Sequence, residues 1–117
     1  MGLIFNYEEV ENYCQSVKKK LANPSPQLRK EIAEQVEMWQ LYYRNRSLSE
    51  LFETVIYDTE RCLEIKGQKL DDAENVSWYL GLFTTIAVQS GLVGDFDNFF
   101  KLAFSKYIQA QNRKNTY

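Results

Sequence analysis

Carboxylates recur at helical spacing in two stretches of this 117-residue chain. The stretch EIAEQVE places Glu31, Glu34 and Glu37 three residues apart, and ELFE gives Glu50 and Glu53 the same spacing. In a helical bundle, such carboxylates bind magnesium and support phosphoanhydride hydrolysis if they face one another across the interior. The spacing therefore raises the hypothesis of a metal-dependent nucleotide phosphohydrolase.

A helical wheel places these carboxylates on the outside. Glu34 and Glu37 lie opposite the apolar stripe that contains Ile32 and Trp39. The carboxylates of ELFE likewise point away from the apolar residues of their own helix. We therefore expect solvated surfaces and no metal or cofactor, which makes the phosphohydrolase the least favoured interpretation.

The chain has no histidine, which excludes Ser–His and Cys–His nucleophilic pairs and histidine metal sites. Its two cysteines, Cys14 and Cys62, form no CxxC motif and share stripes with apolar residues. Free cysteine on such a stripe is typically a small buried hydrophobe. We expect inert, reduced thiols and a protein that is not an enzyme.

The stretch YYRNR offers a different chemistry. Tyr42, Tyr43, Arg44 and Arg46 could stack on bases and contact phosphates, so a nucleic-acid-associated helical protein is the alternative hypothesis. The formal net charge of −2 and the pI near 5.2 argue against a strong electrostatic grip on nucleic acid. Both arginines also stand at a predicted helix C-terminus, where cations complement the helix dipole.

Capping residues and apolar periodicity predict five helices. The first lies within residues 5–23, with Asn6 as its cap and a hydrophobic staple between Phe5 and Val10. The second runs from Pro26 to about Arg44. The third lies between a Ser47 cap and Gly67, the fourth between Asp71 and Ser90 before Gly91, and the fifth runs from Asp95 to about Gln111. The inner stripe of the third helix is expected to begin with Leu48 and to continue through Phe52.

No segment alternates as a strand does, no repeat recurs, and the predicted links are short. We therefore predict an all-α fold, a compact bundle of about five mostly antiparallel amphipathic helices, in one domain spanning residues 1–117. Residues 112–117 are expected to fray.

The uncharged stretch from Val76 to Gly94 nominally reaches membrane-spanning length. Its polar residues, its glycines and its acidic flanks argue against membrane insertion. Gly81 lies on a seam of small residues, which indicates close approach of another helix at the centre of the bundle. Since the N-terminus has no basic region typical of a signal peptide, we expect a cytoplasmic protein.

The second, fourth and fifth predicted helices carry apolar residues outside their inner stripes as well as on them. Aromatic residues and methionine are enriched at the centres of interfaces. The surplus predicts a protein partner, a homodimer, or both, through Met38, Leu41, Tyr42, Trp78, Leu82, Phe99 and Phe104. The favoured hypothesis is a non-enzymatic protein–protein interaction module: a regulator, an inhibitor or immunity-type factor, or a small subunit of an assembly.

Overall fold

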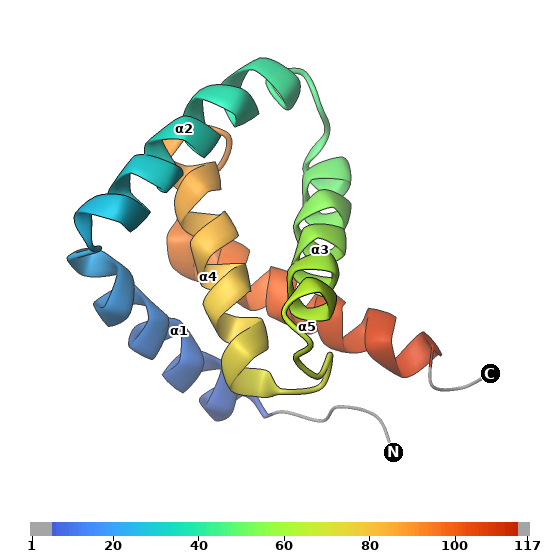
Figure 1. Ribbon diagram of the computed structural model, residues 1–117. Helices are drawn as coiled ribbons and strands as arrows, with labels where there is room; N and C mark the ends of the chain where they lie inside the picture. The colour runs from blue at the N-terminus through green and yellow to red at the C-terminus, as the bar shows by residue number, and fades with distance from the viewer. Residues whose placement is uncertain (1–5, 115–117) are drawn as a thin grey trace.

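The computed structural model describes residues 6–114, which form five helices joined by short links (Figure 1). The helices are α1 (Tyr7–Ala22), α2 (Pro26–Tyr42), α3 (Leu48–Ile65), α4 (Ala73–Gln89) and α5 (Phe96–Lys114). They pack against one another as a compact bundle, so the predicted all-α fold is confirmed. Among the helices of residues 6–114, none has the length and apolar character that crossing a bilayer requires.

Side-chain caps begin most of the helices, as the sequence predicts. The Asn6 side chain accepts a hydrogen bond from the Glu9 backbone N–H at 2.8 Å, and Ser47 accepts one from that of Glu50 at 3.1 Å. Asp95 accepts one from the backbone N–H of Asp97 at the start of α5. These caps satisfy donors that have no partner inside the helix. The predicted staple to Phe5 lies outside the described residues.

The cap of α4 is one residue later than predicted. Asp72, not Asp71, is the N-cap, and its carboxylate accepts hydrogen bonds from the backbone N–H groups of Glu74 and Asn75. A side chain reaches the second and third N–H groups of a helix only from the residue just before its first turn. Because Asp71 and Asp72 are adjacent aspartates, the sequence alone did not show which of the two is the N-cap.

This difference makes a matched pair of substitutions informative. Asp72→Ala is expected to destabilise the fold by about 1 kcal/mol, the usual cost of losing an N-cap side chain. For a chain of this size, that cost lowers the melting temperature by about 4 °C. Asp71→Ala removes a charge one residue outside the helix and is expected to shift it by less than about 2 °C. Equal losses in thermal melts of the two variants would contradict the cap.

Two glycines end helices, as predicted. Gly67 follows α3 with φ of 67°, and Gly91 follows α4 with φ of 79°. Glycine adopts this left-handed conformation without the steric cost that other residues incur. At the other end of the chain, α5 continues to Lys114, so residues 112–114 are helical where a frayed tail is predicted, while residues 115–117 lie outside the described part.

Helix α4 occupies the centre of the bundle. It contacts each of the other four helices, and Figure 1 shows it between α1, α2 and α3, with α5 crossing behind. An ideal Cβ on Gly81 would lie 2.4 Å from Cγ2 of Val17, so glycine is what allows α1 to approach so closely. The predicted central position of this helix and the close approach at Gly81 are both confirmed.

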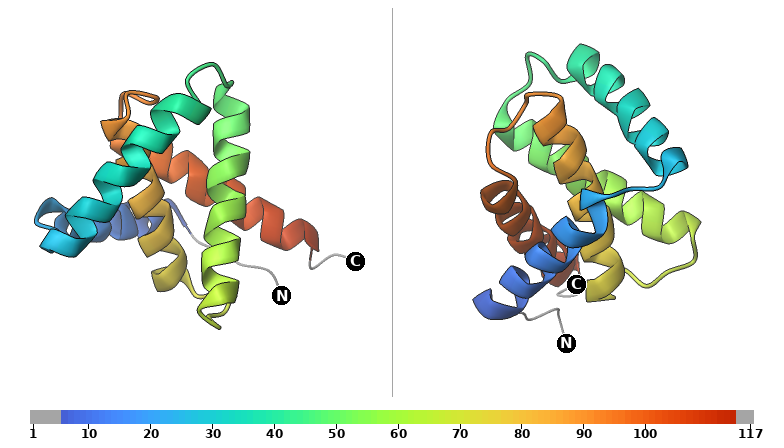
Figure 2. Two further views of the ribbon diagram at one scale, coloured as in Figure 1. Left: turned by 45° about the horizontal axis from the view of Figure 1, so that its top comes forward. Right: turned by 90° about the vertical axis from the view of Figure 1, so that its left-hand side faces the viewer.

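Helix α2 is the peripheral helix of the bundle. Within residues 6–114 its only helix–helix packing is against α4, and both views in Figure 2 show it at the edge of the molecule. Its buried residues are Ile32 and Trp39 alone, and the Trp39 ring stacks on Phe83 of α4 with centroids 6.1 Å apart. Much of the surface of α2 is consequently left to solvent.

Two predicted positions differ from the structure. Leu48, expected on the inner stripe of α3, is 54% exposed because it stands in the first turn, and burial on this helix begins at Leu51. Phe99 and Phe104, expected at an interface, are buried inside the chain. Phe99 stacks on Phe52 of α3 with ring centroids 4.5 Å apart, which accounts for its burial.

Candidate functional site

Exposed large apolar side chains are concentrated at one corner of the molecule. Of eight such side chains among the described residues, four lie between positions 38 and 48: Met38, Leu41, Tyr42 and Leu48. Leu41 is 78% exposed and Tyr42 is 65% exposed. Met38 is three residues before Leu41 and four before Tyr42, a spacing that makes these side chains neighbours on a helix surface.

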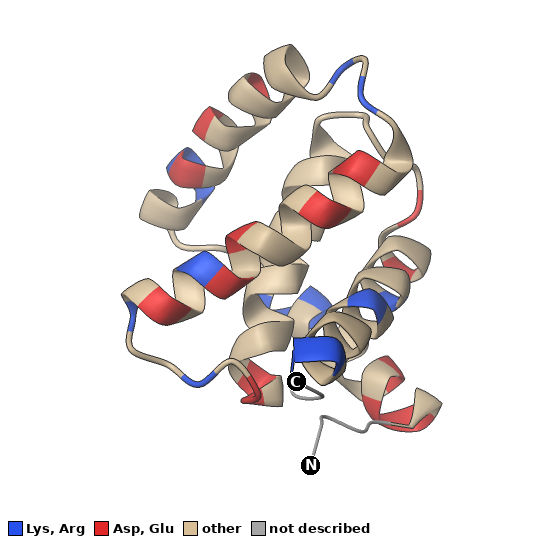
Figure 3. Cartoon of the chain, turned by 90° about the vertical axis from the view of Figure 1, so that its right-hand side faces the viewer, with Lys and Arg blue, Asp and Glu red and all other residues tan. Residues whose placement is uncertain are grey.

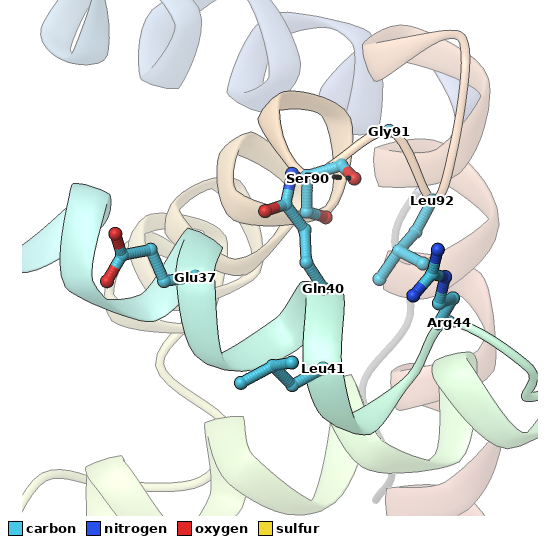
Figure 4. A pocket seen from close by; sticks show the side chains of 7 residues that line it. All are labelled: Glu37, Gln40, Leu41, Arg44, Ser90, Gly91 and Leu92. Atoms are coloured by element: carbon cyan, nitrogen blue, oxygen red, sulfur yellow. Dashed lines mark hydrogen bonds between the residues drawn. The ribbon is translucent and has the colours of Figure 1, made fainter.

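A hollow of about 650 Å³ lies beside this segment, between the end of α2 and the turn from α4 to α5. Figure 4 shows the residues that line it, which are Glu37, Gln40, Leu41, Arg44, Ser90, Gly91 and Leu92. The Gln40 side chain donates a hydrogen bond to the Ser90 backbone carbonyl at 3.5 Å. This long, solvent-exposed contact joins the end of α2 to the end of α4 beside the hollow.

A second, smaller hollow of about 180 Å³ adjoins the first. It shares Arg44, Gly91 and Leu92 with the larger hollow and extends to Leu48 at the start of α3. We use the name α2–α3 corner for the two hollows together with the exposed side chains of Met38, Leu41, Tyr42 and Leu48. Leu41 lines the larger hollow and Leu48 the smaller one, whereas Met38 and Tyr42 line neither. The turn residues 90–92 were not predicted as part of any site.

The α2–α3 corner carries both signs of charge: Glu37 and Arg44 line the larger hollow, and Arg46 lies in the link between the helices. Figure 3 shows this basic link above acidic residues along α3. Arg46 donates to the Glu50 carboxylate at 3.2 Å, and this hydrogen bond lowers the pKa of Glu50. Arg44 has no ion pair within residues 6–114 and lines both hollows. Within the corner, Arg44 is therefore the arginine that is not already paired, and it shares the larger hollow with Glu37.

The structure brings together only some of the predicted interface residues. Met38, Leu41 and Tyr42 share the α2–α3 corner. Trp78 and Leu82 lie on α4 and are partly buried against the core, so they belong to a different part of the molecule. Because Phe99 and Phe104 are buried, the exposed apolar surface is narrower than predicted.

The predicted Tyr–Arg patch is also divided. The Tyr43 ring packs edge-on against Trp39 with centroids 5.2 Å apart and is half-buried, whereas Tyr42 is exposed. Because Arg46 is paired with Glu50, the side chains left for nucleic acid are Tyr42 and Arg44. A stacking platform with a backbone-tracking basic groove needs more than one free aromatic and one free cation.

The carboxylates at helical spacing lie at the surface of α2 and α3. Glu31, Glu34 and Glu37 are exposed on α2, and Glu50 and Glu53 are exposed on α3. Within residues 6–114 no three side chains from His, Cys, Asp or Glu converge as metal ligands would. These positions agree with the predicted solvated surfaces of α2 and α3.

The two thiols differ in accessibility. Cys14 is fully buried, and burial raises the pKa of its thiol to about 11. Cys62 is half-buried rather than buried as predicted, and its thiol pKa is also raised, again mainly by burial. Both environments disfavour the reactive thiolate.

Alkylation at pH 8 should separate the two cysteines. Iodoacetamide is expected to label Cys62 slowly and to leave Cys14 unlabelled, since on the order of one in a thousand Cys14 side chains is a thiolate at that pH. After unfolding in guanidinium both should react fully. Peptide mass spectrometry reads the result, and equal labelling of both cysteines in the folded protein would contradict the burial of Cys14.

Comparison with known proteins gave no relative: the chain matches no protein-family model, no curated protein and no solved structure among those compared with it.

Proposed function

We propose that this protein is a non-enzymatic, cytoplasmic protein–protein interaction module that binds its partner through the α2–α3 corner. A regulator, an inhibitor or immunity-type factor, and a small subunit of an assembly all work in this way. The observation that carries the proposal is the exposure of Met38, Leu41, Tyr42 and Leu48 in one short segment of the chain. An exposed apolar cluster next to a hollow is typical of interaction sites.

The composition of the α2–α3 corner supports the proposal. Tyrosine, methionine and arginine are enriched at interface centres, and Met38, Tyr42 and Arg44 supply one of each. The burial of α2 against α4 alone gives a second support, because the fold itself does not use the outer side of this helix. Apolar side chains that the fold leaves exposed are available for a partner.

Self-association is the other form this binding could take. If the corner joins two copies of the chain, the partner is a second copy of this protein and the complex is the predicted homodimer. Light scattering over a concentration series distinguishes a homodimer from binding to a different protein, since a dimer doubles the molar mass of 13.8 kDa.

A matched pair of substitutions tests the proposal. Leu41→Gln and Leu102→Gln each replace a leucine on the exposed side of a helix, on α2 and α5 respectively. Both variants are expected to keep the wild-type melting temperature within about 2 °C, as exposed substitutions usually do. Leu41→Gln should weaken binding to the partner captured from native cell extract by about thirtyfold, the effect of losing a central apolar anchor. Leu102→Gln should capture it normally.

Other results would redirect the interpretation. If both variants capture the same proteins as wild type, the α2–α3 corner is not the interface. If capture weakens steeply with salt and the captured molecule is nucleic acid, the Tyr42 and Arg44 alternative replaces this proposal. Binding through an apolar surface should change little between low and physiological salt.

A further inference from the structure

Helix α2 is attached to the rest of the bundle differently from the other helices. In the part of the chain that the structure describes, α1, α3 and α5 each pack against two or more helices, whereas α2 packs against α4 alone. The other four helices each bury at least four side chains, and α2 buries two, Ile32 and Trp39. The contacts that hold α1, α3, α4 and α5 together therefore do not involve α2.

The contact between α2 and α4 is bordered by hollows. One of about 300 Å³ lies beside the first half of α2, between Ile32 and Gln89 of α4. The larger hollow of the corner, of about 650 Å³, lies beside its second half (Figure 4). Side chains next to a hollow have fewer packing partners and gain less dispersion energy than core side chains. Within residues 6–114 no ion pair joins α2 to another helix, and the hydrogen bond from Gln40 to Ser90 is 3.5 Å long and exposed.

The sequence of α2 gives this helix little stability of its own. Acidic residues in the first turn and basic residues in the last turn stabilise a helix through its dipole, and α2 has neither. Arg29 and Lys30 lie near its N-terminus and Glu37 lies nearer its C-terminus, the reverse of the favourable order. Because most helical stability in proteins comes from packing, we expect α2 to unfold when it leaves α4.

We infer that α2 opens and closes as one unit on a bundle of α1, α3, α4 and α5 that stays folded. The links at residues 23–25 and 43–47 are the hinges, since they join α2 to helices that are held by other contacts. Opening uncovers the ring of Phe83, on which Trp39 stacks in the closed state. It also removes the larger hollow of the α2–α3 corner, because residues of α2 form one side of that hollow. Since it concerns only contacts within the chain, this opening does not depend on what binds the corner.

Native-state hydrogen exchange of the full-length protein in low guanidinium tests the inference. Amides throughout α2 are expected to share one opening and to be protected at least about a hundredfold less than the slowest amides of α4 and α5. Guanidinium should lower their protection with a shallower slope, because opening α2 exposes less surface than unfolding the bundle. Protection in α2 equal to that in α4 and α5 would overturn the inference. So would fraying from the two ends of α2 while amides around Trp39 stay as protected as those of α4.

A matched pair of alanine-to-glycine substitutions separates opening of α2 from unfolding of the whole chain. Ala33 is on α2, and Ala103 is on α5, which shares no packing with α2 in the described residues. Ala33→Gly should lower the protection of α2 amides about fivefold, the effect of glycine in a helix interior. Ala103→Gly should lower the protection of α4 and α5 amides by about that factor or more and leave α2 amides within about twofold of wild type. If Ala103→Gly lowers protection in α2 as much as in α4 and α5, α2 unfolds only with the bundle and the inference fails.

Discussion

Replacing Trp39 with alanine is expected to release α2 from the bundle while the other four helices remain folded. In the part of the chain that the structure describes, α2 packs on α4 alone and buries only Ile32 and Trp39. Removing a buried tryptophan side chain costs about 3–5 kcal/mol. Because α2 shares no packing with α1, α3 or α5, that cost falls on the contact between α2 and α4.

Hydrogen exchange measures this release helix by helix. Amides of α2 in Trp39→Ala are expected to lose protection by about a hundredfold or more, whereas those of α4 and α5 should change far less. Tyr42→Ala is the control on the same helix, since Tyr42 is 65% exposed and its loss should leave exchange in α2 nearly unchanged. Equal loss of protection in all five helices would show that α2 unfolds together with the rest of the molecule.

Gly81→Ala is expected to destabilise the whole bundle, although alanine is the better helix former. The new Cβ would meet Cγ2 of Val17 at 2.4 Å and Cγ1 at 2.8 Å. Val17 is buried and β-branched, so it has little freedom to turn aside. Overpacking costs about 1–3 kcal/mol or more, and it outweighs a helix-propensity gain of about 1 kcal/mol. The net loss should be about 1–2 kcal/mol, or about 4–8 °C in melting temperature.

A double-mutant cycle isolates the contact. Val17→Ala removes both methyl groups that the new Cβ would meet, so Gly81→Ala should cost less in the Val17→Ala background by at least about 1 kcal/mol. Gly94→Ala is the matched control, because an ideal Cβ there meets nothing within 4 Å. Denaturant unfolding provides the four free energies. Strictly additive losses would mean that α1 and α4 do not meet at this position.

Local signals in the sequence predicted most of the fold. Asn6, Ser47 and Asp95 cap helices because short polar side chains satisfy backbone N–H groups wherever they precede a helical stretch. Gly67 and Gly91 end helices for an equally local reason, a backbone conformation with positive φ. Gly81 indicated close packing of another helix, because glycine is otherwise disfavoured inside a helix.

The candidate site was harder to predict because it depends on how helices cover one another. A helical wheel shows that Met38 and Tyr42 flank the inner stripe and that Leu41 points almost opposite to it. It does not show that, within residues 6–114, α2 packs against α4 alone. The same reasoning placed Phe99 and Phe104 at an interface because it could not show that neighbouring helices enclose α5 at those positions. Solvent exposure of one helix is a property of the whole bundle.

The contribution of Ser90, Gly91 and Leu92 was missed for a similar reason. These residues join α4 to α5, and they face α2 only because the chain folds the end of α4 against it. The apolar Leu92 just after a helix-ending glycine was the available signal. No sequence signal near residues 90–92 indicates that this turn lies beside Arg44, which is far earlier in the chain.

Photo-crosslinking in the native cell tests the central claim, that the α2–α3 corner contacts another polypeptide. A photoreactive phenylalanine analogue replaces Leu41 in one version of the protein and Leu102 in the other, both exposed positions. We expect a discrete crosslinked protein from position 41 and none from position 102. The same products from both positions, or none from position 41, would contradict the claim that this corner is a binding surface.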